Sequence, residues 1–280
     1  MSTVTANLSY FVQPKDGSKP YQAVVEGPNN EQRLERNYTL EQRAVEIENV
    51  RGKEREYTLD KNGFQFYKVP SKHEDFTDDD AIREEYYPES VELIKKLTGA
   101  SQVVLFDHTV RRRVPDKDGD WRSAGSTTRQ PATTVHVDQS TGAAITRVHR
   151  HLPPVDAEAA LRRRFQIINL WRPVRHAALD WPLAFCDFTS VNAEEGGDVV
   201  PTDLRNTTYV GETMSVRYNP GHRWKYLKGM EPDEFVLIKC FDSKDGVAKF
   251  TPHTAFQDPS TPSHAPFRES IELRALVFYD

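Results

Sequence analysis

Short runs that alternate apolar and polar residues, rich in β-branched and aromatic side chains, dominate the chain from residue 103 onward. That texture is typical of strands with one buried face and one polar face. The clearest runs are Val103–Phe106, Thr133–Val137, Phe165–Leu170, Ser215–Tyr218, Phe235–Phe241 and Ile271–Tyr279. We therefore expect a mostly antiparallel β core over residues 101–280, with helices packed outside it.

The first hundred residues show a different pattern, which predicts helices. Tyr38–Val50 mixes apolar and charged residues at helical spacing, and Thr39 with Gln42 forms a candidate capping box. Asp78–Leu97 predicts an acidic helix that ends near Gly99. This part of the chain is therefore expected to be largely helical.

Three further segments complete the expected outline. Asn62-Gly63, between Tyr57–Leu59 and Phe64–Tyr67, predicts a hairpin turn. Asp156–Arg164 predicts another helix, and residues 194–197 predict a loop. No repeat or flexible linker divides the chain, so we expect one domain, 1–280, of mainly β class with flanking helices. In this outline residues 1–100 are a helical and hairpin elaboration of the 101–280 core.

Composition excludes several classes of protein. The 280 residues include 37 Lys and Arg against 42 Asp and Glu, a net charge of -5, without a strong basic cluster, so no nucleic-acid partner is expected. Apolar runs such as Ala275–Tyr279 are far shorter than the roughly 20 residues of a membrane helix. Because residues 1–8 lack the pattern of a secretory signal, we expect a soluble, cytoplasmic protein. Its two cysteines, Cys186 and Cys240, are too few for a disulfide framework or a zinc ribbon.

One alternating segment carries a candidate metal site. Within Pro131–Ser140, His136 and Asp138 are two residues apart, so on a strand both side chains project from the same face. An imidazole and a carboxylate suit a divalent metal, and a second histidine would complete a 2-His-1-carboxylate triad with open positions. With nine histidines in the chain this spacing is a weak signal by itself. A strand-end histidine beside a solvated aspartate explains it equally simply.

The C-terminal region strengthens the metal hypothesis. His253 supplies a distal histidine, and Arg268 and Ser270 follow it on one face of a predicted strand. A guanidinium and a hydroxyl together can bind a carboxylate, and a buried arginine would be costly without an anion. This pair therefore favours a dicarboxylate co-substrate, although taken separately the two residues also fit a surface arginine and a strand-edge serine.

The order of these motifs resembles the iron(II)/2-oxoglutarate-dependent oxygenases. More narrowly, the chain resembles the hydroxylase/desaturase group of secondary metabolism, which includes the cephalosporin 7-alpha-methoxylase component and gibberellin-desaturase-like proteins. The resemblance covers most of the chain. Its blocks are Tyr57-Thr58-Leu59-Asp60 with Asn62-Gly63-Phe64, Phe106-Asp107-His108-Thr109 with Arg111-Arg112-Arg113, Asn169-Leu170-Trp171-Arg172-Pro173, Trp181-Pro182-Leu183-Ala184 with Asp187, Lys239-Cys240-Phe241-Asp242-Ser243, and Arg268 to Phe278.

The resemblance implies a double-stranded β-helix, the cupin-like jelly roll, with a catalytic metal at its mouth. It implies that His136, Asp138 and His253 bind Fe(II), and that 2-oxoglutarate and O2 are co-substrates. The implied reaction hydroxylates or desaturates a small natural-product substrate and releases succinate and CO2. The sequence does not choose between these outcomes, nor does it name the substrate.

The same resemblance implies the co-substrate contacts. Arg268 with Ser270 would bind the distal carboxylate of 2-oxoglutarate, and Arg274, on the same face of that strand, is the second candidate. Asn169 and Arg172 could each contact 2-oxoglutarate or the substrate; alternatively, Arg172 could pair with a carboxylate elsewhere.

Two alternatives to this enzyme remain open at this point. The first is a non-catalytic jelly roll that binds a small molecule or a partner protein. The second is an iron oxidase that does not use 2-oxoglutarate. The oligomeric state is also open, with a homodimer among the possibilities.

Two other histidine motifs predict less. His149-x-His151 has chelating spacing, but an exposed loop explains it better than a second metal site. His222, Trp224 and Tyr226 could line a substrate pocket, whereas core packing is the commoner role of such aromatic residues.

Overall fold

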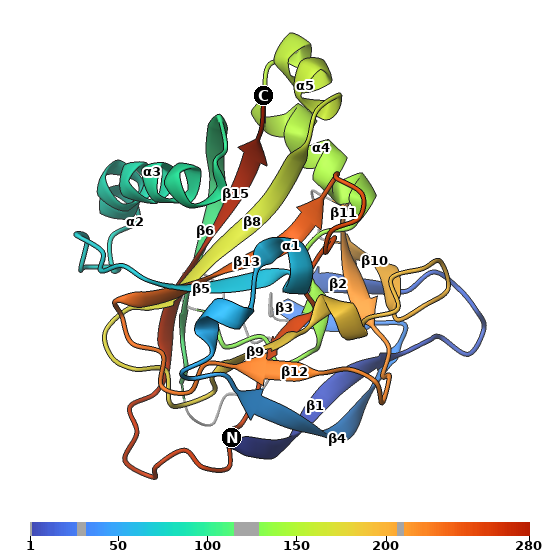
Figure 1. Ribbon diagram of the computed structural model, residues 1–280. Coiled ribbons are helices and arrows are strands. Elements are labelled where there is room, and N and C mark those ends of the chain that lie inside the picture. Colours follow the sequence, from blue (N-terminus) through green and yellow to red (C-terminus); the bar gives the residue numbers. More distant parts are fainter. Residues whose placement is uncertain (1, 27–31, 115–128, 206–209) are drawn as a thin grey trace.

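The computed structural model describes residues 2–26, 32–114, 129–205 and 210–280. Within these ranges the strands form two sheets that face each other (Figure 1). In spatial order the larger sheet contains β1 (Thr3–Val12), β4 (Thr39–Asn49), β12 (Trp224–Tyr226), β9 (Leu183–Cys186), β14 (His253–Ala255), β7 (His136–Val137), β11 (Val210–Val216), β10 (Val199–Arg205), β2 (Tyr21–Glu26) and β3 (Gln32–Arg36). The smaller sheet contains β5 (Phe64–Lys68), β13 (Glu234–Asp242), β8 (Phe165–Pro173), β15 (Glu269–Phe278) and β6 (Gln102–Arg112).

Most strand pairs are antiparallel, as the sequence predicts; β2 with β10 and β4 with β12 run parallel. Every residue of β8 is buried, which is typical of a central strand covered on both faces. One face of β8 packs against helix α3 (Tyr87–Thr98), and the other faces the larger sheet. The shared face of β8 and its neighbour β15 therefore forms one wall of the interior between the sheets.

Aromatic residues join the two sheets. Phe64 of β5 and Phe185 of β9 stack with ring centroids 5.1 Å apart, and Trp171 of β8 belongs to the same buried cluster. Burying each such ring contributes roughly 1.5–3 kcal/mol to folding. This contact fixes the spacing between the sheets and hence between any groups that face each other across it.

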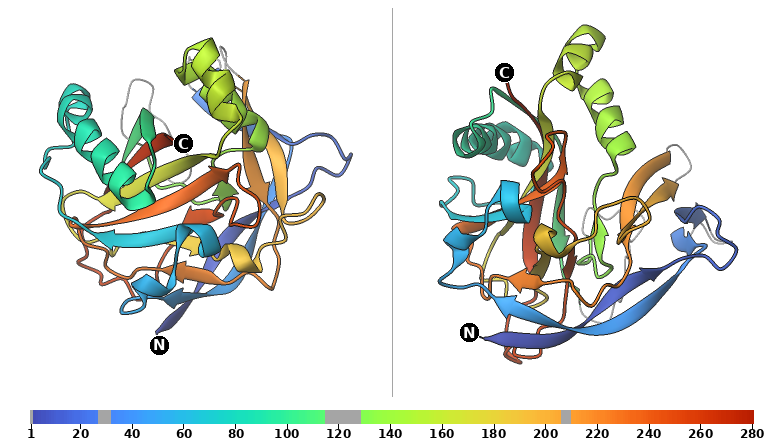
Figure 2. Two further views of the ribbon diagram at one scale, coloured as in Figure 1. Left: turned by 45° about the horizontal axis from the view of Figure 1, so that its top comes forward. Right: turned by 45° about the vertical axis from the view of Figure 1, so that its right-hand side comes forward.

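The helices lie outside the sheets or at one end of them (Figure 2). Helix α3 covers the outer face of the smaller sheet, and α4 (Thr141–His151) and α5 (Pro154–Leu161) pack together over one end. The remaining helical segments are short: η1 (Glu54–Glu56), α1 (Leu59–Asn62), α2 (Asp79–Ala81), the π-helical η2 (Ile82–Tyr86) and η3 (Phe188–Ser190). No helix in the described ranges is both long enough and apolar enough to cross a membrane.

Several predicted segments are confirmed. Asp78–Leu97 is helical through α2, η2 and α3, and Gly99 ends it with a positive φ of 72°. The helix expected over Asp156–Arg164 corresponds to α5, and residues 194–197 form a loop. The predicted strands of the core are present, although β7 is only two residues long.

The helix predicted over Tyr38–Val50 is wrong, because this segment forms β4. Strand β4 pairs with β1 along its length and with β12 on its other side. Gln42 does not cap a helix; its side-chain amide donates a hydrogen bond to Ser9 Oγ on β1. The backbone groups of this segment find distant partners, which a local pattern does not reveal.

The hairpin predicted at Asn62-Gly63 is also wrong. Leu59–Asn62 forms the short helix α1, whose N-terminus is capped by Thr58 and whose end is Gly63 at φ 87°. A Cβ at Gly63 would lie only 2.3 Å from Thr251 Oγ1, so this position needs glycine for its close contact as well as its conformation. The hydroxyl of Thr251 donates to the carbonyl of Gly63, which ties α1 to the segment that leads into β14.

The first hundred residues are therefore not mainly helices and a hairpin. They contribute β1, β4, β2 and β3 to the larger sheet and β5 to the smaller one.

A buried ion cluster joins α1 to β13 and provides a stability test. Lys239 and Asp242 are fully buried with their charged atoms 2.6 Å apart, and Lys239 also lies 3.0 Å from Asp60. Burial alone would raise the pKa of Asp242, but its contacts with Arg164 and Lys239 lower it overall.

We expect Lys239→Met to destabilise the protein by about 3 kcal/mol, because it leaves a buried carboxylate with less compensation. Urea unfolding measures this change. Lys249→Met is the matched control, since its partner Asp245 is fully exposed and such pairs contribute about 0–1 kcal/mol. Equal stability of the two variants would contradict a stabilising role for the buried Lys239–Asp242 pair.

Candidate metal and anion site

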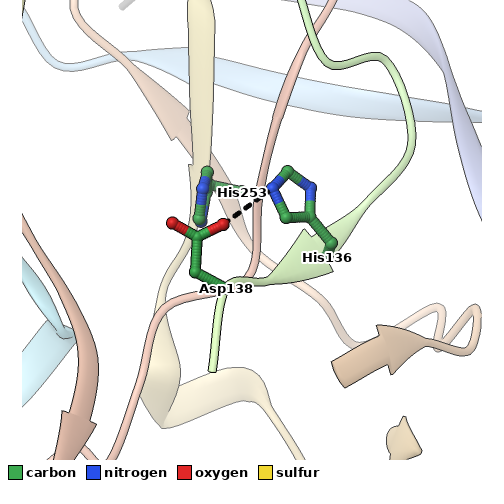
Figure 3. Close-up of side chains that lie close together, drawn as sticks. All are labelled: His136, Asp138 and His253. Carbon is green, nitrogen blue, oxygen red and sulfur yellow. Dashed lines mark ion pairs between the residues drawn. The ribbon is translucent and has the colours of Figure 1, made fainter. Parts of the chain in front are cut away.

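Two short strands of the larger sheet bring together histidines that are far apart in the chain. His136 of β7 and His253 of β14 are direct antiparallel partners, so their side chains share the face that points toward the smaller sheet. Their ring centroids are 4.5 Å apart. Asp138 follows β7 directly, and its Oδ1 lies 3.3 Å from His136 Nε2 (Figure 3). One potential ligand atom from each of the three residues lies within 4.8 Å of the others, as the sequence predicts for a metal triad.

The backbone sets the orientation of both imidazoles. His136 Nδ1 lies 2.8 Å from the carbonyl of Thr134, and His253 Nδ1 lies 2.9 Å from the carbonyl of Thr251. Because a carbonyl only accepts hydrogen bonds, each Nδ1 carries a proton, and the Nε2 atoms are the ones left to face a ligand. Histidines that bind metals are commonly oriented in this way.

The electrostatics match the protonation states that metal binding requires at His253 and Asp138. At His136, burial alone would lower the pKa, but the hydrogen bond and charge of Asp138 raise it overall, so a metal competes with a proton there. Burial lowers the pKa of His253, and the neighbouring His136 lowers it further. Burial alone would raise the pKa of Asp138, but its hydrogen bond with His136 and the charge of Arg274 hold it well below its ordinary value. A neutral imidazole and an ionised carboxylate are the forms that coordinate a cation.

An arginine with unsatisfied groups lies on the same interior wall. Arg268 is 1% exposed; its Nη1 donates to the carbonyl of Trp181 at 2.6 Å, and its guanidinium lies over the Trp171 ring. Among the described residues, Arg268 Nε and Ser270 Oγ are buried without hydrogen-bond partners, and Arg268 forms no ion pair. Burial and the charge of Arg111 lower the pKa of Arg268 to about 9. This combination fits an anion, which would supply the missing partners.

Asp180 and Trp181 hold Arg268 in place, a role that the sequence analysis did not predict, although Trp181 belongs to one block of the family resemblance. Asp180 Oδ2 accepts from the Arg268 backbone N–H at 3.0 Å, and Asp180 Oδ1 binds Arg113 at 2.8 Å. Trp181, whose carbonyl binds the guanidinium, has a positive φ of 45°, a strained conformation for a bulky residue. The Trp181-Pro182 pair gave no local signal of this role, because the contact depends on a residue 87 positions away.

The donor set fits a first-row divalent metal together with a carboxylate co-substrate. Two imidazole nitrogens and one carboxylate oxygen are the ligands of non-haem Fe(II) oxygenase centres, which keep positions open for other groups. The unsatisfied Arg268 and Ser270 groups fit the remote end of a dicarboxylate.

Comparisons with known proteins identify the arrangement. The family described as "Oxidoreductase/YMDC permease-like domain" matches residues 8–278. Hydroxylase/desaturase CTB9 of Cercospora beticola is 34% identical over 287 residues, which cover 98% of this chain and 86% of that protein. The solved structure of the iron and alpha-ketoglutarate-dependent endoperoxidase NvfI superposes with a TM-score of 0.86 and 28% identity, over 99% of this chain and 98% of that one. The chain belongs to the hydroxylase/desaturase family of Fe(II)/2-oxoglutarate-dependent oxygenases.

This membership confirms the predicted fold class and chemistry. The oxygenase has the double-stranded β-helix of its family, uses Fe(II), 2-oxoglutarate and O2, and acts on a small molecule. Aspirochlorine biosynthesis protein N of Aspergillus oryzae is more similar locally, at 44% identity over 137 residues. That match spans 56% of its length, so it does not transfer a substrate to this oxygenase.

The structure separates the other predicted co-substrate residues of the oxygenase. Asn169 and Arg274 are direct partners on β8 and β15, and both contact Asp138. Arg172 lies on the opposite face of β8, where its guanidinium packs over Tyr86 and Phe235. Arg172 therefore does not join the site.

Within the described ranges, Arg172 does not pair with a carboxylate either. Its terminal nitrogens donate to the carbonyls of Pro232 and Val69 at 3.2 and 3.3 Å. The sequence showed an alternating strand but not which of its two faces the metal ligands would approach.

The remaining histidine motifs have structural positions. His149 and His151 lie in the last turn of α4, so the predicted exposed loop is wrong, and the metal-type cluster found among the described residues is the triad alone. Trp224 and Tyr226 are buried in the core, in agreement with the simpler interpretation. The His222 side chain is buried, and its Nε2 lies 3.0 Å from Asp198 Oδ2.

Proposed function

We propose that His136, Asp138 and His253 hold Fe(II) and that Arg268 with Ser270 binds the distal carboxylate of 2-oxoglutarate. The observation that carries this proposal is a buried arginine without an anionic partner in the described structure, on the interior wall that faces a complete 2-His-1-carboxylate set. When bound, the iron supplies oxidation of substrate by O2, coupled to conversion of 2-oxoglutarate to succinate and CO2.

The protein's own residues orient the reactants. The Thr134 and Thr251 carbonyls bind the Nδ1 atoms of the two imidazoles and so fix the direction of their Nε2 atoms. The Trp181 carbonyl and the Trp171 ring restrict the Arg268 guanidinium, so its free Nε has a defined direction. Such pre-organisation matters because misplacement of a reacting group by about 1 Å can cost roughly 10²-fold in rate.

An anaerobic titration of the metal-free protein with Fe(II) and 2-oxoglutarate tests the proposal. We expect the visible charge-transfer absorption of the iron chelate to saturate at one equivalent of iron. His264→Ala, at an exposed histidine, should behave like the native protein. If no absorption develops while the protein remains folded, the proposed centre does not form.

The substrate proposed here is a small natural-product intermediate. The relatives' names support this class: they include hydroxylase/desaturases and a protein of aspirochlorine biosynthesis. Mass spectrometry of reactions with candidate substrates distinguishes the outcomes, since hydroxylation adds one oxygen atom and desaturation removes two hydrogen atoms. Succinate formation that no candidate substrate accelerates would count against this class.

We also propose that the chain is one domain and cytoplasmic, with a homodimer among its possible assemblies. Pairing of β4 with β12 and of β5 with β13 supports the single domain, because each pair joins the first hundred residues to the rest. A single cooperative unfolding transition, microscopy of a fluorescent fusion and analytical ultracentrifugation test these three statements in turn.

A further inference from the structure

We propose that Asn169 and Arg274 are positioning residues for the metal ligand Asp138: they bind its Oδ2, so that Oδ1 alone is offered to the metal. This inference rests on the proposed iron centre. It also assigns Arg274 a role different from binding 2-oxoglutarate.

The contacts on Asp138 divide between its two oxygens. Oδ1 faces His136 Nε2 at 3.3 Å, on the side of the triad. Oδ2 accepts a 2.6 Å hydrogen bond from Asn169 Nδ2 and lies 3.5 Å from Arg274 Nε; Cys240 Sγ is 3.9 Å away. Oδ2 is therefore occupied by protein donors, whereas Oδ1 faces the His136 imidazole.

The smaller sheet fixes the two main donors relative to each other. Asn169 of β8 is the direct antiparallel partner of Arg274 of β15. Direct partners in a sheet project from the same face at close spacing. Asp138, which belongs to the larger sheet's side of the interior, thus meets a rigid pair of donors from the facing wall.

Arg274 differs from Arg268 in how its charge is compensated. Its Nη1 donates to Thr109 Oγ1 at 2.9 Å and to Asp107 Oδ2 at 3.2 Å, and its Nη2 binds the Glu272 carboxylate. With Asp138, three carboxylates therefore surround this one guanidinium. Arg268 has no ion pair in the described structure, so an incoming anion is favoured there and opposed at Arg274.

The orientation of the Asn169 amide follows from the same contacts. An ionised carboxylate only accepts hydrogen bonds, so the amide must present Nδ2 to Asp138. Its Oδ1 is then left buried without a partner among the described residues. Holding a buried acceptor unsatisfied has a cost, which is consistent with an orientation imposed by the site rather than by packing.

Two consequences follow for the metal. A carboxylate held through one oxygen coordinates through the other, which leaves one more position open than a two-oxygen ligand would. Outer contacts of this kind typically change metal affinity by about 10–100-fold.

Co(II) titration of the metal-free protein measures this role without turnover. We expect Asn169→Leu and Arg274→Met each to weaken Co(II) binding by about 10–100-fold and to change the intensity of the visible Co(II) bands, which report coordination number. Arg274→Lys keeps the charge and should recover part of the affinity. Arg162→Met, at an exposed arginine, is the control and should match the native protein.

Arg268→Met separates this inference from the proposed function. It should leave Co(II) affinity within about twofold of native while weakening 2-oxoglutarate binding, because Arg268 does not contact Asp138. Native Co(II) affinity and native spectra in folded Asn169→Leu or Arg274→Met would overturn the positioning role. Failure of the native protein to bind Co(II) would instead overturn the iron centre itself. Circular dichroism identifies any variant that does not fold, and the remaining variants still decide the question.

Discussion

Alanine in place of His136 is expected to lower succinate formation from 2-oxoglutarate by about 10³-fold or more. The reason is the number of ligands: removal of one imidazole leaves His253 and Asp138, and losing even an outer contact of a metal site costs about 10–100-fold. Because the natural substrate is not needed for slow uncoupled decarboxylation, mass spectrometry of succinate in the presence of Fe(II) and O2 measures the effect. His253→Ala should give the same loss.

The fold should survive this substitution. The His136 side chain is 22% exposed, donates a hydrogen bond to the Thr134 carbonyl and lies 3.3 Å from Asp138 Oδ1, so its truncation should cost about 1–2 kcal/mol. His264→Ala controls for the general effect of removing a histidine and should keep native activity. Native rates of succinate formation in folded His136→Ala would remove the metal assignment, and with it the catalytic role of the triad.

Methionine in place of Arg268 is expected to raise the KM for 2-oxoglutarate by about 10²-fold, since each lost charge-assisted hydrogen bond contributes about 1.5–3 kcal/mol. The same variant should be more stable than the native apoprotein by about 1–2 kcal/mol, because an apolar side chain replaces a buried charge that has no anionic partner in the described structure. Steady-state kinetics and urea unfolding measure the two effects. Weaker binding of 2-oxoglutarate together with higher stability of the apoprotein is characteristic of a residue that serves binding rather than folding.

Ser270→Ala is the graded companion to this variant. Its hydroxyl is neutral and buried, so its loss should raise the KM by roughly tenfold, less than the loss of Arg268. If Arg268→Met leaves turnover and the KM unchanged, the anion site is wrong and an iron oxidase that does not use 2-oxoglutarate becomes the better description. If Arg268→Met is instead less stable than the native apoprotein, the contacts of Arg268 within the protein outweigh the cost of burying its charge.

The candidate site could be predicted largely because several of its residues are only two positions apart in the sequence. His136 and Asp138 are two residues apart on one strand, and so are Arg268 and Ser270, which places each pair on one face whatever the rest of the fold does. The N-terminal segments were harder to predict. Strand β4 has only one buried residue, and charged side chains occupy both of its faces. The alternation of apolar and polar residues that marks a strand is therefore absent there, and a helix was expected instead.

Other features had no local signal at all. Which face of β8 looks toward the metal ligands decides that Asn169 contacts Asp138 while Arg172 packs against Tyr86. The backbone of Trp181 is strained, and its carbonyl accepts a hydrogen bond from Arg268 only because the fold places that residue beside it.

By itself the sequence predicted the β class of the core, the metal ligands and the pair proposed to bind an anion, because strand alternation, short spacings and the blocks of the family resemblance are all present in the chain. Only the tertiary structure decided which strands pair, that residues 39–49 extend the larger sheet, and that Arg268 rather than Arg274 lacks anionic partners among the described residues. The physical reason is that hydrogen-bond partners and charge compensation come from residues far apart in the chain. Their positions are set by the packing of two whole sheets, not by the residues next to them.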